Sequence, residues 1–341
     1  MRFGIMYDFR NPQRWYIEPP VFYRAMLDQM IAAEELGFDH VWLTEHHFTE
    51  DAYNPSPLSM AAAIAAVTER IRIGTFVMLM PFIHPVRAAE DITLADILSN
   101  GRFDIGIGQG YTHEEFNAFT IDRRERGPRL TEGIELMRRL FTEENLTFEG
   151  KFTKLGKTTL TPKPVQQPHP PIWVGARGPK AIRRAAELRA NLMTTLGPDP
   201  APAYMAALEE LGEDPSAYRI AQLRMVYCAE SEDQAWEESQ EHLAHVFGYY
   251  ERVLAEAGDV EGDDEPLPFK TPEEIRYSAM ADGAVLIGTP KQVAEKLDKF
   301  CNDFACTDFI LSSHFAGLNP AKSSRSNELF AKEVIPAFKD R

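Results

Sequence analysis

Cysteine is scarce in this chain, and basic residues are fewer than acidic ones. The three cysteines, Cys228, Cys301 and Cys306, form no CxxC pair, so we expect neither a disulfide framework nor a metal site built on them. Lysine and arginine total 36 against 52 aspartate and glutamate residues, which leaves a formal net charge of −16. Because this excess repels phosphate backbones and anionic lipids, binding to nucleic acid or to a membrane surface is disfavoured.

Long apolar runs are absent as well. No stretch approaches the ~20 apolar residues that a helix needs to span a bilayer. Residues 1–7 read as a strand with one basic residue and without the apolar segment of a signal peptide. We therefore expect a soluble protein of the reducing cytoplasm. A chain of 341 residues can bury most of its apolar surface without a disulfide or a metal, as two domains or as one large barrel.

The sequence does contain a repeating pattern, in which short apolar segments alternate with amphipathic stretches of helical period. The predicted strands are Arg2–Tyr7, His40–Thr44, Ile71–Met78, Phe103–Gly108, Pro171–Gly175, Asn191–Leu196, Ala221–Ala229 and Asp308–Ser312. The predicted helices are Pro20–Leu36, Ser56–Arg70, Pro85–Leu98, Arg129–Phe141, Pro179–Arg189, Ala203–Leu211, Ser231–Leu254 and Glu328–Phe338. Eight such units predict a (β/α)8 TIM barrel that forms a single domain over residues 1–341. A doubly wound open sheet is the alternative, because the fifth and sixth predicted strands are short.

Two insertions interrupt this pattern. After the fourth unit, Leu146–Phe148 and Phe152–Leu155 flank a short turn, which predicts a hairpin. The polar, acidic segment Ala257–Asp282 makes a long connection before the eighth strand. A loop of that length in a compact domain is usually functional or disordered, so it is interpreted as an active-site lid or as a solvated insertion.

In a barrel of this kind the active site uses the loops at the C-terminal ends of the strands, so the residues after each strand are the candidates. The second strand ends in Thr44-Glu45-His46-His47-Phe48. Two histidines and a carboxylate suit acid–base chemistry near neutral pH. A metal site is less favoured, because adjacent side chains of an extended backbone point in opposite directions. Packing of one histidine in the barrel mouth is the plainer alternative.

The ends of the third and fourth strands offer a wall and an opening for a ligand. Phe76-Val77-Met78 belong to an unusually apolar strand end, which either lines a pocket for a flat cofactor or is ordinary barrel core. The fourth strand ends in Gly106-Ile107-Gly108-Gln109-Gly110-Tyr111. Glycine there lets a ligand approach the backbone, and we expect Gln109 and Tyr111 to project hydrogen-bonding groups into the mouth.

The end of the fifth strand predicts an anion site. Gly175-Ala176-Arg177-Gly178-Pro179-Lys180 leads directly into a predicted helix. Small residues free the backbone N–H groups, the helix N-terminus carries a positive dipole, and Arg177 offers a bidentate fork. A simple strand-to-helix turn would have the same glycines, but two basic side chains in so acidic a protein favour a phosphate.

A longer set of residues agrees with one known family, in register along nearly the whole chain. They are Gly37–Glu50, Gly74-Thr75, Pro81, His84–Arg87, Glu90-Asp91, Gly101–Phe103, Gly106-Ile107 and Gly288–Pro290. In these residues the chain resembles the luciferase-like flavin monooxygenases, the family of bacterial luciferase. The resemblance implies a (β/α)8 barrel that binds flavin at its C-terminal mouth and forms a homodimer.

The resemblance also implies an activity. In this family reduced FMN (FMNH2) from a separate reductase reacts with O2 to give a C4a-peroxyflavin, which oxygenates the substrate, here a small, apolar organic molecule. His46 matches the catalytic histidine, and Phe76–Val77 matches the place of a non-proline cis peptide beside the flavin. The cofactor-binding residues are then Phe76, Val77, Gly108, Gln109, Tyr111, Gly175, Ala176, Arg177 and Gly178.

Two departures and two alternatives accompany this hypothesis. Bacterial luciferase has an arginine where this chain has Gln109 and a reactive cysteine where it has Gly108, so light emission does not follow from the resemblance. Related families with this barrel use the deazaflavin F420 for hydride transfer, and some members are flavin-binding partner subunits without catalysis of their own. Consumption of O2 during turnover separates a monooxygenase from an F420-dependent oxidoreductase.

Overall fold

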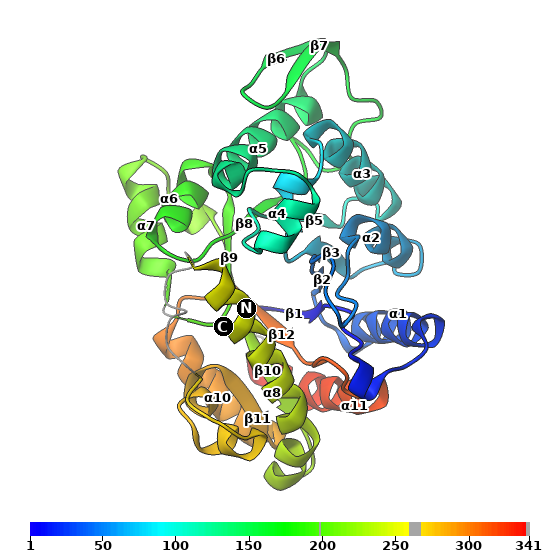
Figure 1. The fold of residues 1–341 in the computed structure, drawn as a ribbon, viewed down its shortest axis with the longest axis vertical. Coiled ribbons are helices and arrows are strands. Elements are labelled where there is room, and N and C mark those ends of the chain that lie inside the picture. Colours follow the sequence, from blue (N-terminus) through cyan, green and yellow to red (C-terminus); the bar gives the residue numbers. More distant parts are fainter. Residues whose placement is uncertain (198, 259–266, 339–341) are drawn as a thin grey trace.

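Eight parallel strands close into a barrel in the computed structural model, which describes residues 1–197, 199–258 and 267–338 (Figure 1). They are β1 (Arg2–Tyr7), β2 (His40–Leu43), β3 (Arg72–Thr75), β5 (Phe103–Gly108), β8 (Ile172–Gly175), β9 (Asn191–Thr194), β10 (Ile220–Cys228) and β12 (Asp308–Ser312). This is also their order around the barrel, and β12 pairs with β1 to close it. The predicted (β/α)8 TIM barrel is confirmed, and the doubly wound sheet is wrong.

Helices cover the outside of the barrel (Figure 1). They are α1 (Pro19–Leu36), α2 (Pro57–Ala65), α3 (Pro85–Leu98), α4 (His113–Ala118), α5 (Arg126–Thr142), α6 (Pro179–Glu187), α7 (Ala201–Glu210), α8 (Glu232–Ala257), α9 (Met280–Gly283), α10 (Pro290–Asp303) and α11 (Pro320–Leu329). Proline opens several of them, because its fixed φ suits the first helical turn, where an N–H group has no partner. No helix within the described ranges has the length and apolar character that crossing a bilayer requires.

A further strand and a further helix are among the elements that the sequence pattern did not predict. Strand β11 (Val285–Gly288) pairs with Met225–Cys228 at the end of β10, while β9 pairs with the beginning of the same edge. Because β10 is longer than β9, its second half would otherwise be an open edge, and β11 covers it. Helix α10 follows β11 directly. The last predicted helix begins too late, since α11 starts at Pro320, after an Asn319 cap, in a polar segment without apolar periodicity.

Both predicted insertions have counterparts in the structure. The hairpin is confirmed as the antiparallel pair β6 (Leu146–Glu149) and β7 (Lys154–Thr158), which projects beyond α5 in Figure 1. Of the long acidic connection, residues 259–266 lie outside the described residues, and so does that part of the predicted lid. The described part contains a 3-10 helix, Pro272–Tyr277, and the short α9.

Two tryptophans fill the interior of the barrel below its mouth. Trp42 of β2 and Trp173 of β8 are almost fully buried, and their rings meet edge to face at 5.7 Å. Glycine is required on the neighbouring strands, because a Cβ at Gly4 would lie 2.6 Å from Trp42 Nε1 and one at Gly74 would lie 2.2 Å from Trp42 Cζ3. The barrel is therefore a packed core, and a ligand has to bind above it, among the loops at the strand ends.

Candidate active site

His46 lies at the barrel mouth between two polar side chains. Its Nδ1 is 2.9 Å from Oε1 of Glu115, and its Nε2 is 3.1 Å from the hydroxyl of Tyr111. Burial raises the pKa of Tyr111 well above its usual value, so the hydroxyl keeps its proton and can donate a hydrogen bond to Nε2. The structure therefore brings together the predicted catalytic residue and one predicted cofactor-binding residue.

Glu115 is a site residue that the sequence did not predict. It is almost fully buried in the short helix α4, where it accepts hydrogen bonds from the backbone N–H of His47 at 2.9 Å and from the hydroxyl of Thr112. Burial alone would raise the pKa of Glu115, but hydrogen bonds from His46, Thr112 and His47 outweigh it and hold the pKa below its ordinary value. An ionised Glu115 accepts a hydrogen bond from the N–H group at Nδ1 of His46 and so fixes the tautomer and the direction of the ring.

The neighbouring histidine belongs to a different contact. His47 Nε2 lies 2.8 Å from Oε1 of Glu45, whose other oxygen accepts from the backbone N–H of Leu79 at 2.9 Å. The His47 ring packs edge to face on Phe119 at 4.9 Å. The two adjacent histidines thus point to different partners, and in the described part of the chain no group of three or more His, Cys, Asp or Glu side chains is arranged to hold a metal ion.

Phe76 and Val77, at the apolar end of β3, lie against the barrel core. The peptide bond between Phe76 and Val77 is cis, as the resemblance implies. Phe76 packs in the cluster that contains the two barrel tryptophans, and Val77 lies against it. Two of the glycines that we expected to face a ligand are required here for another reason. A Cβ atom on Gly108 would lie 2.4 Å from Cγ2 of Val77, and a Cβ atom on Gly175 would lie 3.0 Å from Cγ1 of Val77. These glycines make room for the Val77 side chain.

The predicted anion site lies at the start of α6. Gly178 is the residue before the helix, with a φ of 77° that only glycine adopts readily, and Ala176 and Arg177 precede it at the tip of β8. Arg184, two turns farther along α6, donates from Nη1 to Oε1 of Gln109 at 2.8 Å. A second arginine therefore reaches the same region, and it joins the predicted residues Gln109 and Arg177.

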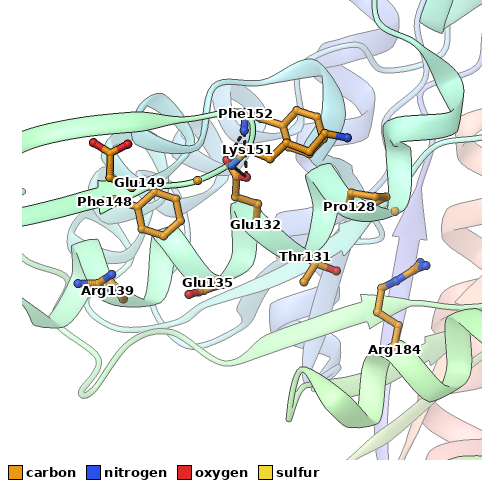
Figure 2. Close-up of a pocket in the computed structure, with 12 residues that line it drawn as sticks. Pro128, Thr131, Glu132, Glu135, Arg139, Phe148, Glu149, Lys151, Phe152 and Arg184 are labelled. Carbon is orange, nitrogen blue, oxygen red and sulfur yellow. Dashed lines mark hydrogen bonds between the residues drawn. The ribbon is translucent and has the colours of Figure 1, made fainter.

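A pocket of about 530 Å³ continues outward from Arg184, between α5 and the β6–β7 hairpin (Figure 2). The Glu132 carboxylate lies at its edge and accepts hydrogen bonds from the backbone N–H groups of Lys151, Phe152 and Thr153, at 2.7 to 3.1 Å. His46 does not line this pocket, which combines acidic, basic and aromatic side chains. The Glu132 carboxylate joins the hairpin to α5 at this pocket, because it accepts hydrogen bonds from the donors of the hairpin turn.

A second buried cluster that the sequence did not predict adjoins His46. Arg10, just after β1, donates from Nε to Oδ2 of Asp51 at 2.6 Å and from its backbone N–H to Oδ1 of Asp8 at 3.1 Å. The ring of Tyr53, after β2, meets the His46 ring edge to face at 4.8 Å. The loops after β1 and β2 thus place a phenol beside the candidate catalytic histidine, and two carboxylates and a guanidinium on the other side of that phenol.

The C-terminal half of α8 covers these loops. The Arg10 guanidinium lies 4.3 Å from the ring centre of Tyr249, and the hydroxyls of Tyr250 and Tyr53 are 3.0 Å apart. At the end of the helix, Arg123 donates from Nη2 to the carbonyl of Ala257 at 3.0 Å. Because these partners follow β1, β2 and β5, α8 is tied to three loops of the mouth and limits the access of water to His46.

Asp8 gives a prediction about stability. Burial raises its pKa from 3.8 to about 6, although Arg10 opposes this effect. The folded protein thus binds the proton more tightly than the unfolded chain, so stability is lost as the pH rises from about 4 through 6. Since an asparagine side chain cannot ionise, Asp8→Asn should gain up to about 3 kcal/mol relative to the wild type between pH 4 and pH 7.5.

Urea unfolding of both proteins at the two pH values measures this difference. Asp28→Asn is the control, because Asp28 is an exposed aspartate on α1 whose replacement should change little at either pH. A difference between wild type and Asp8→Asn that does not change with pH would show that ionisation of Asp8 costs the folded state nothing.

Comparison with known proteins identifies relatives over the whole length of the chain. A family model described as luciferase-like monooxygenase matches residues 1–305. The oxygenase component of a flavin-dependent trigonelline monooxygenase from Acinetobacter baylyi is 30% identical over 335 residues, which are 93% of this chain and 90% of that protein. The crystal structure of the monooxygenase RslO1 from Streptomyces bottropensis has a TM-score of 0.87 at 29% identity and covers 99% of this chain and 100% of its own.

Proteins that use another cofactor are similar to this chain as well. An F420-dependent glucose-6-phosphate dehydrogenase from Microbacterium testaceum is 34% identical over 184 residues, which are 51% of this chain and 53% of that protein. The fold is shared over the whole chain as well: an F420-dependent tetrahydromethanopterin reductase from Methanopyrus kandleri covers 99% of this chain and 99% of its own with a TM-score of 0.74 at 21% identity, which shows the fold alone.

Proposed function

Since this chain belongs to the luciferase-like monooxygenase family, and is thus a flavin-dependent monooxygenase, we propose that it takes reduced FMN from a separate reductase and uses it with O2 to oxygenate a small, largely apolar organic molecule. The observation that carries this proposal is the position of His46, held between Glu115 and Tyr111 at the barrel mouth. The Acinetobacter relative is the oxygenase component of its monooxygenase, which supports a separate reductase.

The residues at the mouth fit a reduced FMN. Phe76 and Val77 offer an apolar wall for a flat ring, and Val77 also contacts the tip of β8, where Arg177 and the start of α6 offer a positive end for a phosphate. When bound, reduced flavin supplies two electrons and activates O2 for transfer of one oxygen atom to the substrate. Everything else in the proposal concerns what the residues of this chain do.

His46 offers a site for a proton at the mouth of the barrel. Because ionised Glu115 accepts from Nδ1, the Nε2 atom is left as the acceptor of the proton from the Tyr111 hydroxyl, 3.1 Å away. A neutral imidazole in this tautomer takes up one proton at Nε2 and returns it, with Glu115 stabilising the cationic ring. The phenol and imidazole thereby form one path for a proton between the reacting groups and Nε2 of His46.

The phosphate assignment gives a prediction about cofactor binding. Arg177→Ala and Arg184→Ala should each weaken FMN binding by about 1–3 kcal/mol, through the loss of a charge-assisted hydrogen bond or of the Gln109 contact. Fluorescence titration of FMN against each variant measures this. Arg183→Ala is the matched control, because Arg183 lies on the same helix but pairs with Glu187 and Glu210 at the surface. Unchanged FMN affinity in both variants would show that the phosphate does not bind at the start of α6.

The activity itself is tested with isotopic oxygen. The purified protein, FMN, a reductase and NADH are incubated under ¹⁸O2 with a panel of small organic substrates, and the products are analysed by mass spectrometry. Incorporation of one ¹⁸O atom into a product, dependent on this protein, is the expected result. Absence of label from every product, with O2 consumed only by the reductase, would contradict the proposal.

The same protein and cofactors distinguish two alternative functions from the proposed one. An F420-dependent oxidoreductase would bind reduced F420 more tightly than FMNH2 and turn over without O2. A flavin-binding partner subunit would bind FMN and form no product. The intact set of His46, Glu115 and Tyr111 favours catalysis over a purely binding role, because such a hydrogen-bonded series is not needed to hold a flavin.

The remaining parts of the proposal concern assembly and location. A homodimer is supported by Leu94, Ile97 and Leu98, which are exposed on one face of α3. Cytoplasmic location stays a prediction from the low cysteine content.

A further inference from the structure

We propose that Arg10 binds a carboxylate of the substrate, so that the enzyme acts on small organic acids whose apolar part extends from Arg10 towards His46. The inference rests on the proposed function, because it names the class of molecule that is oxygenated at the same mouth. It concerns a cluster defined by Asp8, Arg10, Asp51 and the tyrosines Tyr53, Tyr249 and Tyr250, which we call the Arg10 cluster.

The Arg10 guanidinium has donors that the described residues do not use. The side chain is 0% exposed, and its Nε donates to Oδ2 of Asp51 at 2.6 Å. Nη1 and Nη2 have no hydrogen-bond partner within the described ranges, and neither does Oδ1 of Asp51. Asp51 therefore accepts from Nε alone, and the edge of the guanidinium that Nη1 and Nη2 form has no acceptor among the described residues. Because a buried donor without an acceptor is costly, these two N–H groups favour an acceptor that arrives from outside the chain.

The geometry of the free edge selects a carboxylate. Nη1 and Nη2 form a planar fork whose parallel N–H bonds match the two oxygens of a carboxylate. The guanidinium is held over the ring of Tyr249 at 4.3 Å and lies 5.6 Å and 5.9 Å from the ring centres of Tyr53 and Tyr250. Aromatic surroundings keep the fork in one plane and exclude water, so that a bound carboxylate meets a rigid partner.

The position of the cluster connects it with the reaction site. Tyr53 contacts Arg10 on one side and meets the His46 ring at 4.8 Å on the other. One aromatic ring thus separates the guanidinium from the candidate catalytic histidine. A small acid bound to Arg10 spans that distance with a ring or a short chain, which places its apolar part at the mouth.

The backbone between the two charged residues supports a binding role. Phe9, which lies between Asp8 and Arg10, has a φ of 61°, in the left-handed region that non-glycine residues rarely adopt. Such conformations persist where the surrounding structure enforces them, and they gather at ligand-binding sites. Here the conformation lets Asp8 bond to the backbone N–H of Arg10 while the Arg10 side chain reaches Asp51.

The other charges around Arg10 determine the pH at which an anion binds. Asp8, Asp51 and His245 face the cluster, the last with its Nε2 at 3.5 Å from Asp51, together with three tyrosines that burial keeps neutral. Burial raises the pKa of Asp8 to about 6, so protonation of Asp8 below that pH removes one competing negative charge. We therefore expect a carboxylate to bind more tightly at pH 6 than at pH 8.

The experiment compares acids with their amides on the full chain, without flavin. Benzoate, 1-naphthoate and hexanoate are titrated by calorimetry at pH 6 and pH 8, beside benzamide, 1-naphthamide and hexanamide. We expect at least one acid to bind about tenfold or more tightly than its amide. Arg10→Lys should lower the affinity for that acid about tenfold and leave the amide unchanged, because lysine keeps the charge and loses the fork.

Two further variants complete the test. Asp8→Asn should raise the affinity for the acid severalfold at pH 8 and remove most of its pH dependence. Arg14→Lys is the matched control, since Arg14 is an exposed arginine four residues along, paired with Glu241, and its change should alter nothing. Thermal unfolding of each variant shows whether it is folded.

Several outcomes would overturn the proposal. These are wild-type protein that binds no acid better than its amide, a folded Arg10→Lys that keeps full acid affinity, or an Asp8→Asn that weakens it. If Arg10→Lys does not fold, the acid–amide difference in the wild type and the gain in Asp8→Asn decide. Because these titrations need neither flavin nor O2, their failure leaves the proposed oxygenation standing, and failure of ¹⁸O labelling leaves the anion site standing.

Discussion

Replacement of His46 by alanine is expected to remove oxygenation while FMN binding stays within about threefold of the wild type. The imidazole touches Glu115, Tyr111 and Tyr53, and it has no contact with the start of α6, where we place the phosphate. General acid–base groups contribute about 10²–10⁴ to the rate, so the loss of product formation should lie in this range. Reduced flavin should then be consumed with release of hydrogen peroxide in place of product.

Three measurements on the same protein separate the effects. Fluorescence titration gives FMN affinity, product analysis gives the oxygenation rate, and an oxygen electrode with a peroxide assay gives the uncoupled fraction. His47→Ala is the control, because His47 pairs with Glu45 and packs on Phe119 away from His46. Product formation by His46→Ala within threefold of the wild type would exclude the acid–base role, and loss of FMN binding would assign His46 to the cofactor instead.

The fold could be predicted from the sequence because its signal is local. Each barrel strand is a short apolar segment followed by an amphipathic helix, and proline or glycine marks many of the boundaries. Strand β11 has the same local signal, because the apolar segment Val285–Gly288 is followed directly by α10, which begins with Pro290 and a capping box at Thr289. The prediction missed it because eight units were already assigned elsewhere and a long polar connection precedes it. The organisation as one domain over residues 1–341 stays a prediction.

The candidate site divides in the same way. His46, Gln109, Tyr111 and Arg177 all follow strand ends, so the rule that barrel sites use these loops finds them. Glu115 is on a six-residue helix, and its bond to His46 joins residues 69 positions apart in the chain. No spacing rule predicts such a contact, which depends on how the loop after β5 folds over the loop after β2.

Two other sets of residues left a signal in the sequence. Asp8 and Arg10 come directly after β1, where the rule about strand ends applies as well as it does after β2. Lys180 and Arg184 are four residues apart on α6, a spacing that puts both on one face of a helix and extends the basic turn at Arg177. Tyr249 and Tyr250 had no such signal, because α8 reaches the mouth only through its length and its direction across the barrel.

Glu115→Gln is expected to lower the turnover number by about 100-fold or more while FMN affinity and KM change little. Glutamine has the same shape but is not an anion, and in one of its two orientations its NH2 group takes the place of Oε1, which faces both Nδ1 of His46 and the backbone N–H of His47. The imidazole then loses both the acceptor that fixes its tautomer and the charge that stabilises its protonated form. In a catalytic triad the corresponding change from carboxylate to amide costs about 10⁴ in rate, which sets the upper range of the effect.

The matched control is Glu45→Gln, which makes the same change in the neighbouring pair of His47 and Glu45 and should keep the turnover number within about threefold. Nitrogen NMR of ¹⁵N-histidine protein adds a readout that a loss of stability alone would not move. In the wild type the proton of the neutral His46 ring should be found on Nδ1, and in Glu115→Gln it should be shared between both nitrogens. A Glu115→Gln enzyme with full turnover, or with the proton still fixed on Nδ1, would mean that packing in the mouth orients His46 without help from the buried carboxylate. The positioning role would then pass to Tyr53 and Tyr111, whose rings meet His46 edge to face.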